Sequence, residues 1–126
     1  MERLIGGPLG ALEAGMRFRR VRQGALAANL ANADTPGYRR VDVSFDSSLN
    51  RAAAELQRTG DAHLQANGSQ GYRVERDRLS RGPDGNGVER DLEVIKLSRN
   101  AGAFEDQATV LARLFRMRRV AATGQP

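Results

Sequence analysis

The chain has 126 residues, a length that suits one ordinary domain. It carries 20 basic and 15 acidic residues, a net charge of +5, and no cysteine, which excludes disulfides, thiolate metal sites and a cysteine nucleophile. Apolar residues make up 40% of the chain but aromatic residues only 5%, a composition that favours helix packing over a β-sandwich.

The first expected element is a helix over residues 9–33. No proline interrupts this stretch, and small or apolar residues recur at steps of three or four, which is the spacing of one helical face. Gly15 and Gly24 each lower helix stability by roughly 1 kcal/mol relative to alanine. We therefore expect this helix to need a packing partner.

The residues after this helix predict an abrupt stop. Pro36 disfavours the helical conformation at Thr35, and Gly37 offers the positive φ that a type II turn needs after a proline. Asn29 and Asn32 lie three residues apart and share one face of the last helical turn. Spacing alone indicates an ordinary helix, C-cap and turn, although the residue types are more particular than such a turn requires.

The middle of the chain, residues 34–87, is predicted to hold this turn, a short strand and a flexible polar segment. Apolar and polar residues alternate over 41–46, which is the period of a strand. A short helix is expected over 49–58, and residues 59–87 are expected to form a loop or a weakly ordered hairpin around 72–74. Glycines recur through 59–87 among scattered apolar residues, so this segment cannot bury much surface.

The strongest periodic signal predicts a helix over residues 88–122. Its apolar residues step alternately by three and four over about four heptads, a pattern typical of a coiled-coil seam. Further apolar residues flank the seam, so we expect it to pack in a layer of several helices. The helix-packing seam consists of Val94, Leu97, Ala101, Phe104, Ala108, Leu111 and Phe115.

Together these elements predict a mainly α fold in a single domain, residues 1–126. The long N- and C-terminal helices are expected to pair in a coiled-coil-like arrangement, and the flexible polar middle to contain at most short strands. Apolar faces that one chain leaves uncovered favour assembly with other copies or relatives. Contacts that repeat without closing produce a filament or tube.

A run of residues in the turn region carries a specific resemblance. Residues 29–38 read Asn-Leu-Ala-Asn-Ala-Asp-Thr-Pro-Gly-Tyr. This run resembles the N-terminal signature of the bacterial flagellar axial proteins, the rod, hook and hook-associated subunits. Residues 84–104 resemble the C-terminal region of proximal rod proteins of the basal body, with departures at Val94, where the family commonly has methionine, and at Phe104, where tyrosine is usual.

The resemblance implies a structural subunit of the flagellar basal-body proximal rod, the tubular drive shaft that transmits torque and conducts exported subunits. The implied partners are other copies of the chain, other rod and basal-body proteins and the flagellar type III export apparatus. The terminal helices would form the inner core of the rod, and the turn would make contacts between subunits. The turn residues implied in this contact are Asn29, Asn32, Asp34, Thr35, Pro36, Gly37 and Tyr38.

The resemblance also implies a location in the rod that crosses the periplasm. The N-terminus has no apolar run long enough for the core of a secretory signal, and no window approaches the length of a membrane span. We therefore expect export without a cleaved signal peptide.

Three alternatives stay open: a sister proximal rod subunit, a generic coiled-coil adaptor, and a basic helical protein that binds nucleic acid. Arginines group at residues 17–22 and 113–119, but no helix-turn-helix spacing or basic zipper region precedes the last helix. A coiled-coil adaptor would explain the C-terminal heptads but not the sequence of residues 29–38.

The sequence offers little for catalysis or cofactor binding. His63 is the only histidine and lies in a polar stretch without a cluster of other metal ligands. The chain has no phosphate-binding loop, nucleophile elbow or zinc-protease motif. We expect no enzyme activity, no cofactor, no metal, no small-molecule substrate and no nucleic-acid partner.

Overall fold

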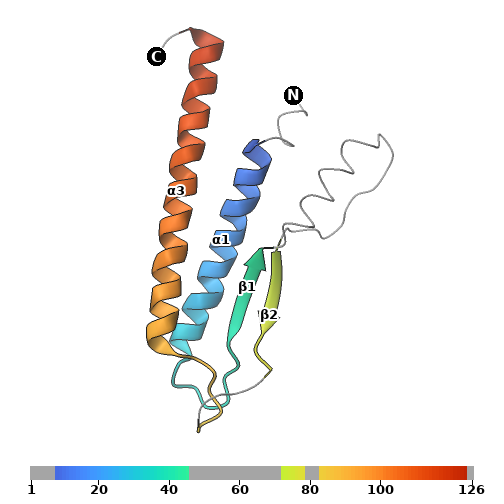
Figure 1. Cartoon of the computed structure of the whole chain (residues 1–126), viewed down its shortest axis with the longest axis vertical. Helices are drawn as coiled ribbons and strands as arrows, with labels where there is room; N and C mark the ends of the chain where they lie inside the picture. Colours follow the sequence, from blue (N-terminus) through green and yellow to red (C-terminus); the bar gives the residue numbers. More distant parts are fainter. Residues whose placement is uncertain (1–7, 46–71, 79–82, 125–126) are drawn as a thin grey trace, which may run out of the picture.

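A computed structural model of the chain describes residues 8–45, 72–78 and 83–124. Its elements, in order, are α1 (Pro8–Ala31), β1 (Val41–Phe45), β2 (Tyr72–Arg76) and α3 (Arg90–Thr123). Helix α1 lies between α3 on one side and the two-stranded sheet on the other (Figure 1). This arrangement confirms the predicted mainly α fold with long terminal helices and short strands. The helix expected over 49–58 and His63 lie outside the described residues.

Helix α1 begins at a proline, which is well suited to the first helical turn because the missing N–H has no helical partner there. It ends two residues earlier than the sequence predicts, at Ala31 rather than at residue 33. Gly37 has the expected positive φ, 71°, and the N–H of Tyr38 donates to the carbonyl of Thr35 at 3.2 Å. The proline and glycine therefore form the turn that ends the first helical segment.

Helix α3 has 34 residues against 24 in α1, and its C-terminal end reaches past α1 in Figure 1. Asp91 and Glu93 lie in its first turn, where negative charge interacts favourably with the positive end of the helix dipole. At the other end, Gly124 adopts the left-handed conformation and donates its N–H to Val120 at 2.7 Å. These capping features place the helix at residues 90–123, close to the expected 88–122.

The sheet joins two segments that are far apart in the chain. Strand β1 pairs antiparallel with β2, with Val43 opposite Val74 and Phe45 opposite Tyr72. Residues 72–74, expected to be loop or a weakly ordered hairpin, are therefore part of a strand paired with β1. Phe18 of α1 meets Phe45 edge-to-face at 5.4 Å between ring centroids, a favourable aromatic geometry. The buried apolar side chains of the described residues are Phe18, Leu26 and Val43.

Gly24 provides a test of helix propensity in α1. A Cβ at this position would meet no other described atom within 4 Å, so Gly24→Ala adds helix propensity without a clash. We expect the free energy of unfolding to rise by about 0.5–1 kcal/mol, measured by urea denaturation followed by circular dichroism. Gly37→Ala is the matched control: its φ of 71° should make the same change destabilising by about 1 kcal/mol. A lower free energy of unfolding for Gly24→Ala would contradict the placement of Gly24 at an open position of helix α1.

Candidate functional site

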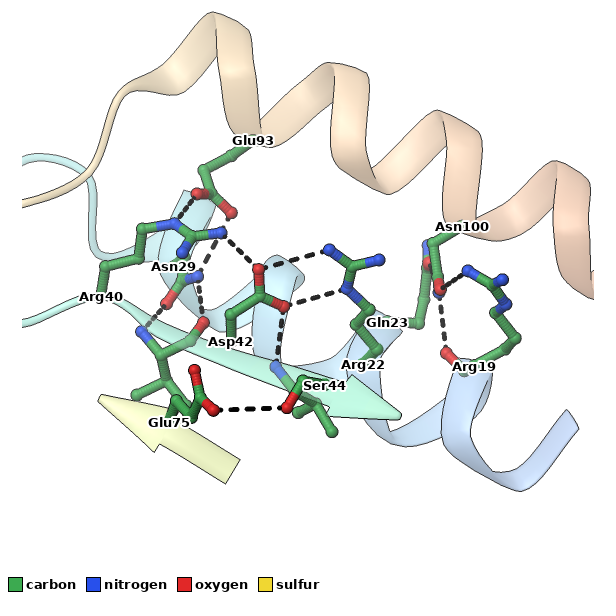
Figure 2. A network of polar contacts seen from close by, with 12 residues as sticks. Arg19, Arg22, Gln23, Asn29, Arg40, Asp42, Ser44, Glu75, Glu93 and Asn100 are labelled. Carbon is green, nitrogen blue, oxygen red and sulfur yellow. Dashed lines mark hydrogen bonds and ion pairs between the residues drawn. The ribbon is translucent and has the colours of Figure 1, made fainter. Parts of the chain in front are cut away.

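Asn29 lies in the last turn of α1 and is fully buried. Its amide nitrogen donates to the backbone oxygen of Val41 at 2.6 Å, and its amide oxygen accepts the backbone N–H of Val41 at 3.0 Å. One side chain thus satisfies both backbone groups of the first residue of β1, as a neighbouring strand would (Figure 2). The same oxygen accepts the Tyr38 hydroxyl at 3.2 Å. Asn29 therefore fixes the path of the chain from the turn into β1.

Glu93 connects this region to α3. It is fully buried, and its carboxylate accepts a hydrogen bond from the Asn29 amide at 3.2 Å and forms an ion pair with Arg40. Arg40 also contacts Asp42 at 2.9 Å, and Asp42 accepts two hydrogen bonds from Arg22 at 2.9 and 3.3 Å. The charges alternate along this chain of contacts from α3 through β1 to α1 (Figure 2). Such pairing is what makes burial of a carboxylate tolerable.

The two charged groups in the middle of this network have shifted pKa values. Burial alone would raise the pKa of Asp42, but hydrogen bonds from Arg22, Arg40 and the Val43 N–H outweigh it and lower the pKa to about 2. Burial would lower the pKa of Arg40, but its contacts with Glu93 and Asp42 prevail and raise the pKa above its usual value. Both groups are therefore held in their charged forms at neutral pH.

The lowered pKa of Asp42 predicts a stability effect in acid. A carboxyl group with a depressed folded-state pKa stabilises the fold above its ordinary pKa of 3.8, and this contribution is lost as the pH falls toward about 2. At pH 5 we expect the free energy of unfolding of the wild type to exceed that of Asp42→Asn by about 1–2 kcal/mol. This difference should vanish near pH 2. Urea denaturation of both proteins at several pH values between 2 and 6 measures it. A pH-independent difference would contradict this role of Asp42.

The segment before α3 binds directly to the turn after α1. Asn86 is almost fully buried, and its amide nitrogen donates to the backbone oxygens of Asn32 at 2.9 Å and Thr35 at 2.7 Å. Both carbonyls belong to the turn and already accept backbone N–H groups, from Thr35 and Tyr38, so Asn86 adds a second donor to each. Two backbone hydrogen bonds join the same segments, from Gly37 N–H to Asp84 and from Gly87 N–H to Tyr38. The turn is thus held by the chain that leads into α3.

The structure divides the residues expected in the subunit-contact turn by exposure. Asn29 is buried and all its hydrogen-bond partners lie within the chain, whereas Asn32 and Tyr38 are half-buried. Asn32 caps α1, because its amide nitrogen donates to the Ala28 carbonyl at 2.8 Å. Asp34 is exposed and pairs with Arg90 at the start of α3. The exposed members are Asp34, Thr35, Pro36 and Gly37.

The expected seam of α3 is only partly covered. Val94 is 48% exposed and Phe115 is 51% exposed, at the two ends of the seam. Between them, the half-buried members are Leu97, Ala101, Phe104, Ala108 and Leu111. Ala101 and Phe104 also line an open cavity of about 230 Å³ beside α1.

Sequence reasoning missed the residues of α3 that are most deeply buried. These are Glu93 and Asn100, which are 0% and 1% exposed and point toward α1 (Figure 2). Both immediately precede a seam residue, and they are seven residues apart. That spacing is the one signal in the sequence that could have identified them, because an apolar pattern search passes over polar residues.

The described part of the chain offers no group of three or more metal-ligating side chains. Among the helices of the same residues, none is long and apolar enough to cross a membrane. What the site does contain is a set of buried polar contacts that fix a turn and leave four of its residues exposed. Such an arrangement is suited to presenting a rigid surface.

Comparison with known proteins finds relatives among flagellar basal body rod proteins. The family described as flagella basal body rod protein matches residues 11–39, which cover most of α1 and the turn. A flagellar basal body rod protein FlgB of Proteus mirabilis is 36% identical over 76% of this chain and 79% of its own length. The FlgB protein of Salmonella typhimurium is 35% identical, covering 82% and 88%. That of Cereibacter sphaeroides is 32% identical, covering 83% and 85%.

Proposed function

This chain belongs to the FlgB family of flagellar basal body rod proteins, and we propose that it assembles into the proximal rod through its turn and the exposed side of α3. As a member of that family it is a structural subunit of the rod and associates with other rod and basal-body proteins. The family is structural rather than enzymatic. The finer role we propose is that of a proximal segment of the drive shaft, which transmits torque and conducts exported subunits.

The observation that carries this proposal is the amount of apolar side chain that α3 leaves exposed. Large apolar groups exposed along one helix usually mark a surface that another protein covers. Phe115 and Met117 are 51% and 66% exposed near the end that reaches past α1. Further exposed members on α3 are Leu92, Val94, Ile95 and Val110. We propose that helices of neighbouring subunits cover these residues from more than one side of α3, and that the seam residues contribute to the contact.

The turn is the second proposed contact. Its exposed residues are Asp34, Thr35, Pro36 and Gly37. The Asn86 side chain fixes this bend by donating hydrogen bonds to two of its backbone oxygens. A bend stiffened in this way loses little conformational entropy when a neighbour binds. We propose that these four residues contact an adjacent rod subunit, whereas Asn29 acts from inside the chain to hold the bend.

The Phe115→Asp variant should impair assembly into the rod but leave the fold of the single subunit intact. Phe115 is half exposed, so its replacement should change the free energy of unfolding by no more than about 0.5 kcal/mol. In the rod, however, the new carboxylate would be buried without a partner, at a cost of several kcal/mol. We expect loss of swimming motility and absence of the variant from purified basal bodies, scored by motility agar and immunoblotting.

Thr109→Asp is the matched control, because Thr109 is exposed on the same helix and is not a seam residue. It introduces the same charge and should leave motility intact. Normal motility with Phe115→Asp as the only copy would contradict the proposed contact. Loss of motility in both variants would show that any added charge on α3 disrupts the rod, which would also remove the case for the seam.

The experiment that tests the rod assignment is peptide mapping by mass spectrometry of purified hook–basal bodies. We expect peptides of this chain there, in preparations that also contain other rod proteins. An N-terminal peptide that is intact apart from possible loss of Met1 would support export through the type III apparatus without a cleaved signal. Absence of the chain from intact basal bodies would overturn the assignment and favour a coiled-coil adaptor.

A further inference from the structure

Three polar residues of α3 face α1 at intervals of seven: Glu93, Asn100 and Gln107. Glu93 and Asn100 are almost completely buried, and Gln107 is half-buried. Each of the three contacts a different residue of α1. Glu93 meets Asn29 at 3.2 Å, whereas Gln107 lies over Gly15, where a Cβ would come within 2.9 Å of its amide nitrogen.

Asn100 is the central residue of the three. Its amide nitrogen donates to the backbone oxygen of Arg19 at 2.7 Å and to the side-chain oxygen of Gln23 at 2.8 Å. Its oxygen lies 3.5 Å from a guanidinium nitrogen of Arg19 (Figure 2). Arg19 is itself positioned over the ring of Phe18, 5.2 Å from its centroid. Asn100 therefore contacts one particular turn of α1, and another polar stretch of the helix would not supply the same partners.

The apolar residues between these positions do not specify a register. Leu97, Phe104 and Leu111 are large, half-buried and also spaced by seven residues. Sliding α3 by seven residues along α1 would bring two of the three to the position of another member. A repeating apolar seam therefore tolerates such a slip, and polar residues in helix interfaces are what usually exclude it.

The polar residues do not tolerate the same slip. Moving α3 by seven residues would separate Glu93 from Asn29 and Arg40, and Arg40 would keep only Asp42. In one direction the slip would bring the Glu93 carboxylate to the Asn100 position, where the oxygens of Arg19 and Gln23 require a donor. We propose that Glu93, Asn100 and Gln107 are the specificity-determining residues that select a single register of α3 on α1. This inference concerns the fold of one subunit and is independent of the rod.

Two further atoms agree with a role in specificity rather than in maximal stability. The Gln107 side-chain oxygen and the Nε of Arg19 are buried and have no hydrogen-bond partner among the described residues. A buried polar atom without a partner is destabilising. An interface of leucines at these positions would avoid that cost, but it would also lose the distinction between registers.

The register can be measured as a distance, because the chain has no cysteine of its own. We would place spin labels on the full-length chain at Glu13→Cys and Ser98→Cys, both exposed, and record double electron–electron resonance in samples diluted with unlabelled protein. A slip of seven residues moves one label along the helix axis by roughly 10 Å. The unsubstituted interface should give a single distance.

Glu93→Leu, Arg40→Met, Asn100→Leu and Gln107→Leu, combined in one variant, should still unfold cooperatively in urea but add a second distance population, shifted by up to roughly 10 Å. Glu105→Leu with Thr109→Leu adds two leucines at exposed positions of α3 and should keep the single distance. A single unshifted distance in this combined variant would overturn the proposal, as would several distances in the original chain. Should the combined variant not fold, Glu93→Gln with Asn100→Leu and Gln107→Leu carries the same expectation, and a single distance there overturns it equally.

Discussion

Replacement of Glu93 by alanine is expected to lower the free energy of unfolding by about 3–5 kcal/mol. The reason is that Arg40, only 12% exposed in its side chain, would lose its carboxylate partner on α3 while remaining buried. Asn29 would lose an acceptor for its amide nitrogen as well. Since single domains are stable by only about 5–15 kcal/mol, the variant should be largely unfolded in moderate urea. Urea denaturation monitored by circular dichroism measures the difference.

Glu89→Ala is the control for this change, because Glu89 is an exposed carboxylate beside the same helix terminus. It should alter the free energy of unfolding by no more than about 0.5 kcal/mol. Replacing both partners, with Glu93→Leu and Arg40→Met, should recover much of the loss, since no buried charge is then left alone. A loss below about 1 kcal/mol for Glu93→Ala would mean that Asp42 alone compensates the charge of Arg40, or that Arg40 reaches solvent.

The second large effect is expected for Asn29→Ala, with a loss of about 2–4 kcal/mol. The substitution removes one small side chain but leaves the backbone N–H and oxygen of Val41 and the Tyr38 hydroxyl without their partner. Each buried polar group left unsatisfied costs about 1–3 kcal/mol, although relaxation and water entry recover part of the sum. Urea denaturation gives the stability, and hydrogen exchange at the Val41 amide should accelerate in parallel.

Two substitutions make the Asn29 result specific. Asn32→Ala removes an asparagine three residues away that is less buried and bonds mainly within its own helix end, so we expect a loss of at most about 1 kcal/mol. Asn29→Asp retains an oxygen acceptor for Val41 but places a second carboxylate beside Glu93, so it should be no more stable than Asn29→Ala. Equal stabilities of Asn29→Asp and the native chain would contradict the proposed amide pairing.

The long helices could be predicted from sequence because their signals are local. Apolar spacing and the proline and glycine of the turn act within a few residues of one another, so α1 and α3 end within two residues of the expected limits. The pairing of β1 with β2 could not be predicted in the same way. Strand β2 reads Tyr-Arg-Val-Glu-Arg and is mostly exposed, so its partner is decided by backbone hydrogen bonds to a distant segment rather than by its own pattern.

The turn lies where the sequence predicts it, but the roles of its residues depend on the other elements. Asn29 is buried only because β1 and α3 close over it, which spacing within one helix cannot reveal. Glu93 and Asn100 were passed over for a related reason. Glutamate and asparagine on a long helix usually face solvent, and their burial follows from partners that another helix supplies.

The pairing of Phe45 with Tyr72 also has a consequence for protein engineering. The chain leaves β1 at residue 45 and returns to β2 at residue 72, so the two ends of the intervening segment are fixed side by side by the sheet. The entropy cost of closing a loop grows slowly, by about 0.6 kcal/mol for each doubling of its length. An epitope or a reporter domain inserted between residues 45 and 72 would therefore lengthen a segment whose two ends the sheet already holds together, at a small entropy cost. This makes the connection from β1 to β2 suitable for labelling the assembled protein.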